Sequence, residues 1–208
     1  ILDRNDPSGE WKLVQPREQG IEYYVYHHGD YLYQITNKDA INFKMIRTTL
    51  NGGKEDEIIP NRDNTTLDNV SMFKYHMAVL ERVNGNLEIR LFNFEDESWY
   101  NIEMNEDIYS LTFEENYDWN SDFFRFGYGS FKTPYCVYDI DFKSHKKTLR
   151  KKEEILGGYE SENYVSERIW APTHDGKKLA ITLLYKKGIN LKGNNPCFLW
   201  GYGSYGAP

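Results

Sequence analysis

Short alternating segments separated by tight turns recur along this sequence, and they limit the folds open to it. Tyr, Phe, Val, Ile and Thr are concentrated in stretches where inward and outward residues alternate with a period of two, which is typical of β-strands. Turn sequences such as Asn51-Gly52-Gly53 and Asn84-Gly85-Asn86 separate these stretches. Gly and Asn readily adopt the positive φ angles of tight hairpins. The pattern predicts antiparallel meanders.

The predicted strands fall into three sets before about residue 154. They are 22–28, 31–37 and 43–50; then 67–74, 77–83, 87–94 and 99–104; then 108–114, 123–128, 134–142 and 148–152. The sets recur at roughly 40 to 45 residues with about four strands each, which matches a propeller blade. We therefore predict a mainly β fold with a partial β-propeller of about three four-stranded antiparallel blades over residues 1–154. A β-sandwich with regular hairpins remains the alternative.

The pattern changes after Glu154, and we predict a second region over residues 155–208. A turn-rich crossing leads to a strand near 164–170, and a His174-Asp175-Gly176 turn leads to a second strand near 179–185. The run 196–200 is almost wholly apolar, which is typical of a strand buried on both faces of an α/β sheet. We interpret 155–208 as a linker followed by the first strands of an α/β domain.

Charge and cysteine content limit the partners. The formal net charge is −7 at pH 7, so the surface as a whole repels phosphate backbones and anionic lipid, and we expect neither nucleic acid nor membrane as a partner. The basic run 143–152 is interpreted as an exposed hairpin, because Glu153 and Glu154 follow it directly. Cys136 and Cys197 lie too far apart for a zinc ribbon or disulfide framework, which favours a reducing, cytoplasmic location.

Several motifs that suggest chemistry are better explained as structure. Residues 201–206 fit G-x-G-x-x-G, but bulky Tyr202 and Tyr205 suit a phosphate turn poorly, and the similar 127–131 leads into another predicted strand. Gly-Tyr-Gly-Ser is therefore interpreted as a turn. Ser204 is out of register for the G-x-S-x-G elbow of serine hydrolases. The histidines show no metal-binding spacing: His27, His28, His76, His145 and His174. We expect no cofactor and no metal.

The end of the chain resembles the prolyl oligopeptidase family of serine peptidases. The resemblance is carried by residues 163–171, the His174–Gly176 turn and above all Asn195-Pro196-Cys197-Phe198-Leu199-Trp200-Gly201-Tyr202-Gly203-Ser204-Tyr205-Gly206. Residues 27–31, 58–62 and 126–134 resemble late propeller blades of the same family, in the same order. The Gly-Tyr-Gly-Ser-Tyr-Gly form is more similar to the oligopeptidase B (protease II) branch than to prolyl oligopeptidase itself.

The resemblance implies a seven-bladed propeller that caps an α/β-hydrolase domain and admits short peptides, which the oligopeptidase B branch cleaves after Arg or Lys. It places the family's oxyanion-hole tyrosine at Tyr202. The nucleophilic Ser, the Asp and the His of the family triad have no counterpart in residues 1–208, so we expect this chain to be an inactive fragment. Its expected partners are short peptide substrates in the intact enzyme, and the missing blades and catalytic domain of the same protein. The alternative is a stand-alone β-repeat binding module.

Overall fold

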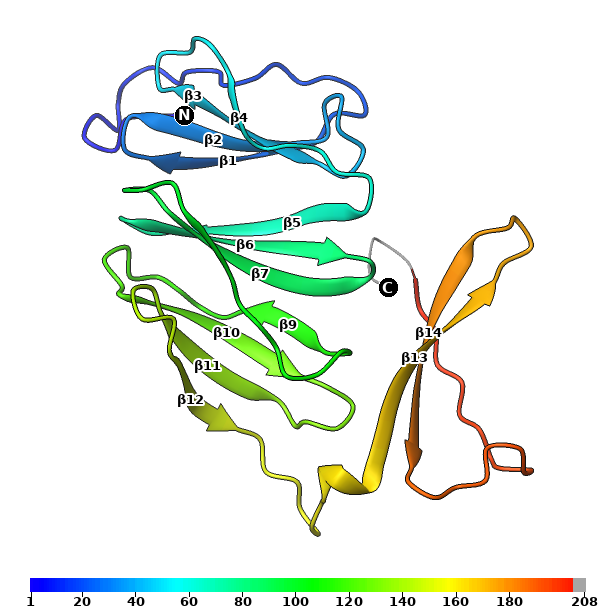
Figure 1. Ribbon diagram of the computed structural model, residues 1–208. Helices are drawn as coiled ribbons and strands as arrows, with labels where there is room; N and C mark the ends of the chain where they lie inside the picture. The colour runs from blue at the N-terminus through cyan, green and yellow to red at the C-terminus, as the bar shows by residue number, and fades with distance from the viewer. Residues whose placement is uncertain (204–208) are drawn as a thin grey trace. The chain divides into compact units, whose positions relative to one another are not determined.

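The computed structural model describes residues 1–203, which form fourteen β-strands and one three-residue 3₁₀ helix (Figure 1). They divide into two compact units, Ile1–Asn61 and a second unit that begins at Arg62. Three of the sheets have four antiparallel strands each, and a fourth has two. No helix in residues 1–203 is long and apolar enough to span a membrane.

The first unit contains one sheet whose strands follow chain order. Its strands are β1 (Tyr23–His28), β2 (Tyr31–Thr36), β3 (Lys44–Thr49) and β4 (Asp56–Ile59). β1 and β2 are joined by Gly29 and Asp30, and Gly29 has φ +57°, the left-handed conformation that such a short hairpin needs. β4 was not predicted, because it has only four residues and two of them are acidic. β4 is a strand because it pairs with β3, and its own sequence pattern does not indicate one.

The second unit begins with two more sheets of the same topology. The second sheet contains β5 (Thr65–Met72), β6 (His76–Val83), β7 (Asn86–Asn93) and β8 (Trp99–Asn101). The third contains β9 (Ser110–Phe113), β10 (Phe123–Gly129), β11 (Cys136–Asp141) and β12 (Lys147–Lys152). Each is a four-stranded antiparallel meander in chain order, which confirms the three predicted blades and argues against the sandwich.

A single apolar core joins these two sheets. Its fully or almost fully buried members are Phe73, Ala78, Leu80, Ile89, Leu91, Ile102, Leu111, Phe124, Phe126, Tyr128, Ile140 and Phe142. Five of these members are aromatic, and Phe73 meets Phe124 edge to face with ring centroids 6.2 Å apart. The basic strand β12 is exposed along its whole length, as predicted for the 143–152 hairpin.

The Gly-Tyr-Gly-Ser sequence at 127–130 does not mark a turn as predicted. Gly127 and Gly129 both lie within β10, and the chain turns only from Ser130 onward. At Gly127 an added Cβ would lie only 2.5 Å from the ring atom Cζ of Tyr135 and closer still to the hydroxyl oxygens of Tyr135 and Thr112. Glycine is present because a side chain crosses the strand there, a contact that a local pattern does not reveal.

The last sheet is a long hairpin. The 3₁₀ helix η1 (Ser161–Asn163) precedes β13 (Tyr164–Pro172), which pairs with β14 (Lys178–Lys186) across the predicted His174–Gly176 turn (Figure 1). Both strands agree with the prediction, and each extends further.

The predicted buried strand at 196–200 is wrong for this structure. Those residues form no strand, and Phe198 and Leu199 are each 86% exposed. A strand buried on two faces needs strands at both edges and layers over both faces, and nothing in residues 1–203 supplies them. The assignment of 155–208 to the start of an α/β domain stays a prediction.

Candidate functional site

The predicted oxyanion-hole residue, Tyr202, lies in an extended and exposed segment. Its side chain is 66% exposed, and the structure brings no other predicted site residue to it. Ser204 and the rest of the Gly-rich motif lie outside the described residues. The role of Tyr202 therefore stays a prediction.

The histidines occupy packing and turn positions. His76 stacks on Phe142 with ring centroids 4.2 Å apart, and His145 stacks on Tyr100 at 3.6 Å. Burial lowers the pKa of His76, so this ring is held in its neutral, better-packing form. Within residues 1–203, no three His, Cys, Asp or Glu side chains gather in a way that could hold a metal ion.

The most elaborate polar site in the described chain surrounds the carboxylate of Glu106, in the segment between β8 and β9. Tyr128 on β10 donates its hydroxyl to Oε1 at 3.0 Å, and Thr133 donates to the same oxygen. Ser130 donates to Oε2 at 2.8 Å. The Ser130 hydroxyl oxygen also accepts the N–H groups of Lys132 at 3.0 Å and Thr133 at 2.8 Å, so one carboxylate organises the whole β10–β11 turn.

These contacts keep Glu106 ionised. Burial alone raises the pKa of a carboxyl group, but the hydrogen bonds from Thr133, Ser130 and Tyr128 outweigh it and lower the pKa of Glu106 below its usual value. Burial, together with the hydrogen bond to Glu106, raises the pKa of Tyr128. At neutral pH the site is therefore a carboxylate held by neutral hydroxyl donors.

A cavity of about 190 Å³ adjoins this carboxylate. Its walls are Met104, Asn105, Glu106, Phe126, Tyr128, Thr133, Tyr138 and Lys147. Phe126 and Tyr138 stack with centroids 5.8 Å apart, and Tyr128 meets Tyr138 edge to face at 6.4 Å. A hollow that combines aromatic walls with a few polar and charged groups, here including Glu106 and Lys147, has the chemistry of a ligand site.

The same turn also contacts the linker that leads to β13. Tyr159 donates its hydroxyl to the backbone carbonyl of Lys132 at 2.9 Å and stacks on Tyr164 with centroids 5.4 Å apart. Gly157 and Gly158, just before it, have φ angles of +89° and +85°. The linker is thus attached to the third sheet through the loop that Glu106 organises.

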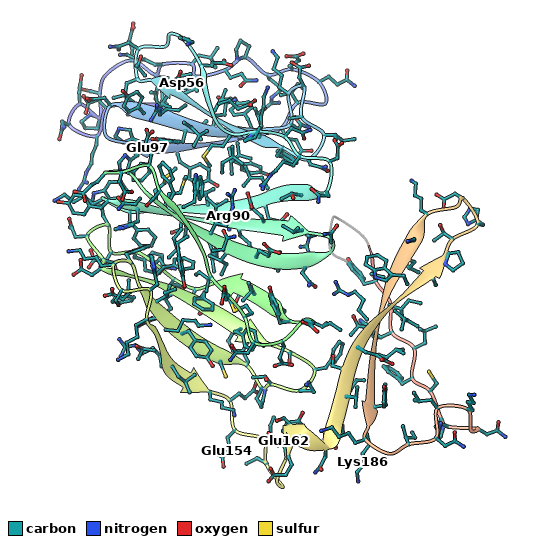
Figure 2. The ribbon with its side chains drawn as sticks, in the orientation of Figure 1. Asp56, Arg90, Glu97, Glu154, Glu162 and Lys186 are labelled. Carbon is teal, nitrogen blue, oxygen red and sulfur yellow. The ribbon has the colours of Figure 1, made fainter. Side chains whose placement is uncertain are left out.

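Two other carboxylates, unlike Glu106, are almost fully buried, and each is held by two arginines. Glu81 on β6 is 1% exposed. Its carboxylate accepts hydrogen bonds from Arg90 Nε at 2.7 Å and Arg90 Nη2 at 2.6 Å, and Arg62 is its second partner. Arg90 is labelled in Figure 2. Asp139 on β11 is 3% exposed and is bound by Arg125 and Arg150. They are structural ion pairs. Glu81, Asp139 and Glu106 were not predicted as site residues, because their partners come from other strands and turns.

Comparison with known proteins agrees with this architecture. A family model described as the N-terminal β-propeller domain of prolyl oligopeptidase matches residues 1–153. Dipeptidyl aminopeptidase BI from Pseudoxanthomonas mexicana is 33% identical over 96% of this chain and 28% of its own length. Protease 2 from Moraxella lacunata is 28% identical over 100% of this chain and 30% of its own length.

Solved structures show the same relationship. Oligopeptidase B from Trypanosoma brucei, in a closed form with covalently bound antipain, superposes with a TM-score of 0.87 at 32% identity, over 93% of this chain and 29% of its own. Oligopeptidase B from Leishmania major gives a TM-score of 0.86 at 26% identity. The chain spans less than a third of the length of these relatives. It belongs to the prolyl oligopeptidase family of serine peptidases, and residues 1–153 are part of its N-terminal β-propeller domain.

Proposed function

We propose that this chain is part of a serine oligopeptidase of the oligopeptidase B type, whose intact form hydrolyses short peptides after Arg or Lys while the propeller limits access. The main support is the agreement with T. brucei oligopeptidase B at 32% identity and a TM-score of 0.87. That protein carries covalently bound antipain. The proposed partners are short peptides and the further blades and catalytic domain of the same protein. The proposed location is cytoplasmic, in keeping with two free thiols, Cys136 and Cys197.

The intact protein provides the direct test. A continuous reading frame that includes residues 1–208 is expressed, and kcat/KM is measured on matched fluorogenic dipeptides that end in Arg, Lys or Pro. We expect the Arg and Lys substrates to be favoured by at least about tenfold, since a site built for a charged side chain strongly rejects analogues that lack the charge. A preference for Pro would contradict the oligopeptidase B assignment and leave only the family.

The 208-residue chain is proposed to be inactive. It contains no G-x-S-x-G sequence, so it offers no elbow to expose a nucleophilic serine. A fluorophosphonate probe reacts covalently with activated serines, and we expect no labelling of this chain under conditions that label the intact protein. Labelling of any serine within 1–208 would refute the proposal.

We assign Tyr202 to the oxyanion hole of the intact enzyme. Its hydroxyl would donate to the oxyanion of the tetrahedral intermediate, and loss of such a donor typically lowers kcat by about 10²–10³. The variant Tyr202→Phe in the intact protein is expected to lower kcat with little change in KM, because the bond strengthens only as charge develops. Exposed Tyr24, which lies in the first unit, provides the control as Tyr24→Phe, with no expected effect. Equal activity of the two variants would show that Tyr202 has no catalytic role.

The alternative proposal is a β-repeat binding module without catalysis. The aromatic cavity beside Glu106 is the observation that favours it, since a binding module needs a built pocket and no triad. A stop codon directly after Pro208, together with cooperative unfolding of the purified chain, would support this alternative over the peptidase.

A further inference from the structure

The charge of Glu106 is not balanced by any cation in direct contact. Its three hydrogen-bond donors are the neutral hydroxyls of Tyr128, Ser130 and Thr133. Among residues 1–203, no Lys or Arg nitrogen forms an ion pair with it, whereas the buried Glu81 and Asp139 each have two arginines. Glu106 is only partly buried, and Lys132 acts on its carboxylate through longer-range attraction without forming an ion pair. A cation in direct contact would interact with this carboxylate more strongly than Lys132 does, so Glu106 favours a positively charged partner.

The cavity beside Glu106 has walls that suit an organic cation. Phe126 and Tyr128 are almost fully buried, and their rings, with that of Tyr138, form the apolar wall. Aromatic rings carry a negative potential on their faces and attract ammonium and guanidinium groups, most strongly when the cation is shielded from water. Met104 adds a flexible apolar side chain that can pack against methylene groups.

The size of the cavity limits the ligand to a side chain. Its volume is about 190 Å³. An engineered cavity of about 150 Å³ in another protein holds one benzene molecule. The space therefore accommodates a guanidinium or ammonium group with a few methylenes, and excludes a folded partner.

Lys147 is the one cation that lines the cavity, and it opposes binding of a second. Its side chain comes from the exposed strand β12, and its Nζ donates to the backbone carbonyl of Glu103 at 2.5 Å. An exposed lysine held by a single carbonyl can move into solvent at little cost. Lys147 is therefore expected to weaken binding of a cation without preventing it, and its removal should strengthen binding.

We propose that the Glu106 cavity binds an alkylguanidinium or alkylammonium group, as carried by an Arg or Lys side chain of a peptide. The carboxylate pairs with the cation, and the rings of Phe126, Tyr128 and Tyr138 pack against it and its methylenes. The site is formed by the segment between β8 and β9 together with the third sheet, and it would act in addition to the groups that hold the residue at the cleaved bond. Only the choice of a peptide as the source of the cation rests on the proposed peptidase function.

The first experiment titrates the 208-residue chain with n-butylguanidinium and n-butylammonium at constant ionic strength, followed by NMR of the aromatic side chains or by calorimetry. N-butylurea is the neutral, similarly shaped control. We expect saturable binding of both cations and none of the urea. The variant Glu106→Gln keeps an acceptor for the hydroxyls but removes the charge, and should weaken binding by at least about tenfold. The matched control is Glu103→Gln, an exposed carboxylate three residues away, with an expected change below about twofold.

A second variant keeps the test decisive if Glu106→Gln does not fold. Lys147→Met removes the opposing charge from an exposed position, and we expect it to tighten binding of both cations about threefold. Unchanged affinity in the Glu106 variant, weaker binding in the Lys147 variant or equal binding of N-butylurea would each overturn the proposal.

N-acetyl-argininamide distinguishes a peptide from a free amine as the source. If it binds within about threefold of n-butylguanidinium and competes with it, the peptide source is supported, because the pocket then tolerates a peptide backbone on the cation. If only the free cation binds, the peptide part of the proposal is wrong. None of these readouts needs hydrolysis, so failure of the peptidase proposal would leave them unaffected.

Discussion

Replacing Glu81 by Gln should destabilise the second unit more than any surface charge change. Glu81 is 1% exposed and accepts two hydrogen bonds from Arg90, at 2.7 and 2.6 Å, and one from Arg62. Glutamine has nearly the same shape, so Glu81→Gln changes charge and hydrogen bonding with little change in packing. The amide can accept with one oxygen only, and its NH₂ group faces guanidinium donors.

The magnitude follows from the exposure of the partners. Removing one member of a fully buried ion pair costs about 3–5 kcal/mol, because the other charge is left unpaired. Here Arg90 is 18% exposed and Arg62 is 34% exposed, so water partly compensates both guanidiniums. We therefore expect a loss of about 2–3 kcal/mol in the free energy of unfolding, at or below the lower end of the range for a fully buried pair. This corresponds to a decrease in Tm of about 4–12 °C for a unit of this size.

The assay is urea unfolding at pH 7, followed by tryptophan fluorescence and far-UV circular dichroism, with Tm as a second measure. The control is Asp68→Asn, which removes the Asp68–Arg82 pair on the neighbouring strands β5 and β6. That pair is 3.0 Å apart, but both side chains are 25% exposed, so we expect a loss below about 1 kcal/mol. Similar m-values in all variants would show that the same surface is exposed on unfolding.

Equal losses for Glu81→Gln and Asp68→Asn would refute the reasoning, since burial would then have no influence on the value of an ion pair. The double variant Glu81→Leu with Arg90→Met provides a further check. Replacing buried charged groups together by apolar groups is often near neutral, and Arg62, the partner that remains, is 34% exposed, so the double variant should be more stable than Glu81→Gln.

Three further predictions concern the third sheet and the linker. Burial raises the pKa of Asp139, but the hydrogen bonds from its two arginines lower it more, so the pKa in the folded protein lies below the ordinary Asp value of about 4. The ionised Asp139 therefore stabilises the fold above about pH 4, and this stabilisation is lost as the pH falls through the pKa of the folded state. Asp139→Asn should therefore lower the free energy of unfolding at pH 7 and reduce its further decrease below about pH 4, as measured by unfolding at a series of pH values. The same decrease below about pH 4 in both proteins would contradict this. Gly127→Ala should lower the free energy of unfolding by about 1–3 kcal/mol, because the added methyl group clashes with Tyr135. The double variant with Tyr135→Ala should recover part of this loss in urea unfolding, and no recovery would mean that Tyr135 is not the obstacle. Tyr159→Phe removes the hydrogen bond to the Lys132 carbonyl, which is worth about 1 kcal/mol. Amide hydrogen exchange in residues 155–163 should therefore become about fivefold faster, and an equal exchange rate would show that this bond does not hold the linker.

Much of the fold was predictable because it depends on local chemistry. The period-two alternation of segments such as 31–37 and 87–94 indicated strands, and turn residues such as Gly85, at φ +84°, indicated where they reverse. The regular spacing of these segments then predicted three four-stranded blades, and the sheets of the structure confirm them. The resemblance to the prolyl oligopeptidase family rested mainly on residues 163–171 and 195–206, and the membership it implied is confirmed by the family match over residues 1–153.

Tertiary structure decided what depends on contacts between distant residues. β4 has too weak a pattern of its own and is a strand only because β3 pairs with it. The apolar run 196–200 has a strong pattern, but within residues 1–203 no strand pairs with it. Gly127 is required by a tyrosine eight positions away, and the charge of Glu106 is held by hydroxyls 22 to 27 residues away. Alternation reports which residues avoid water along one strand. It contains no information about which side chain of another strand or turn will lie opposite, and that is what builds a binding site.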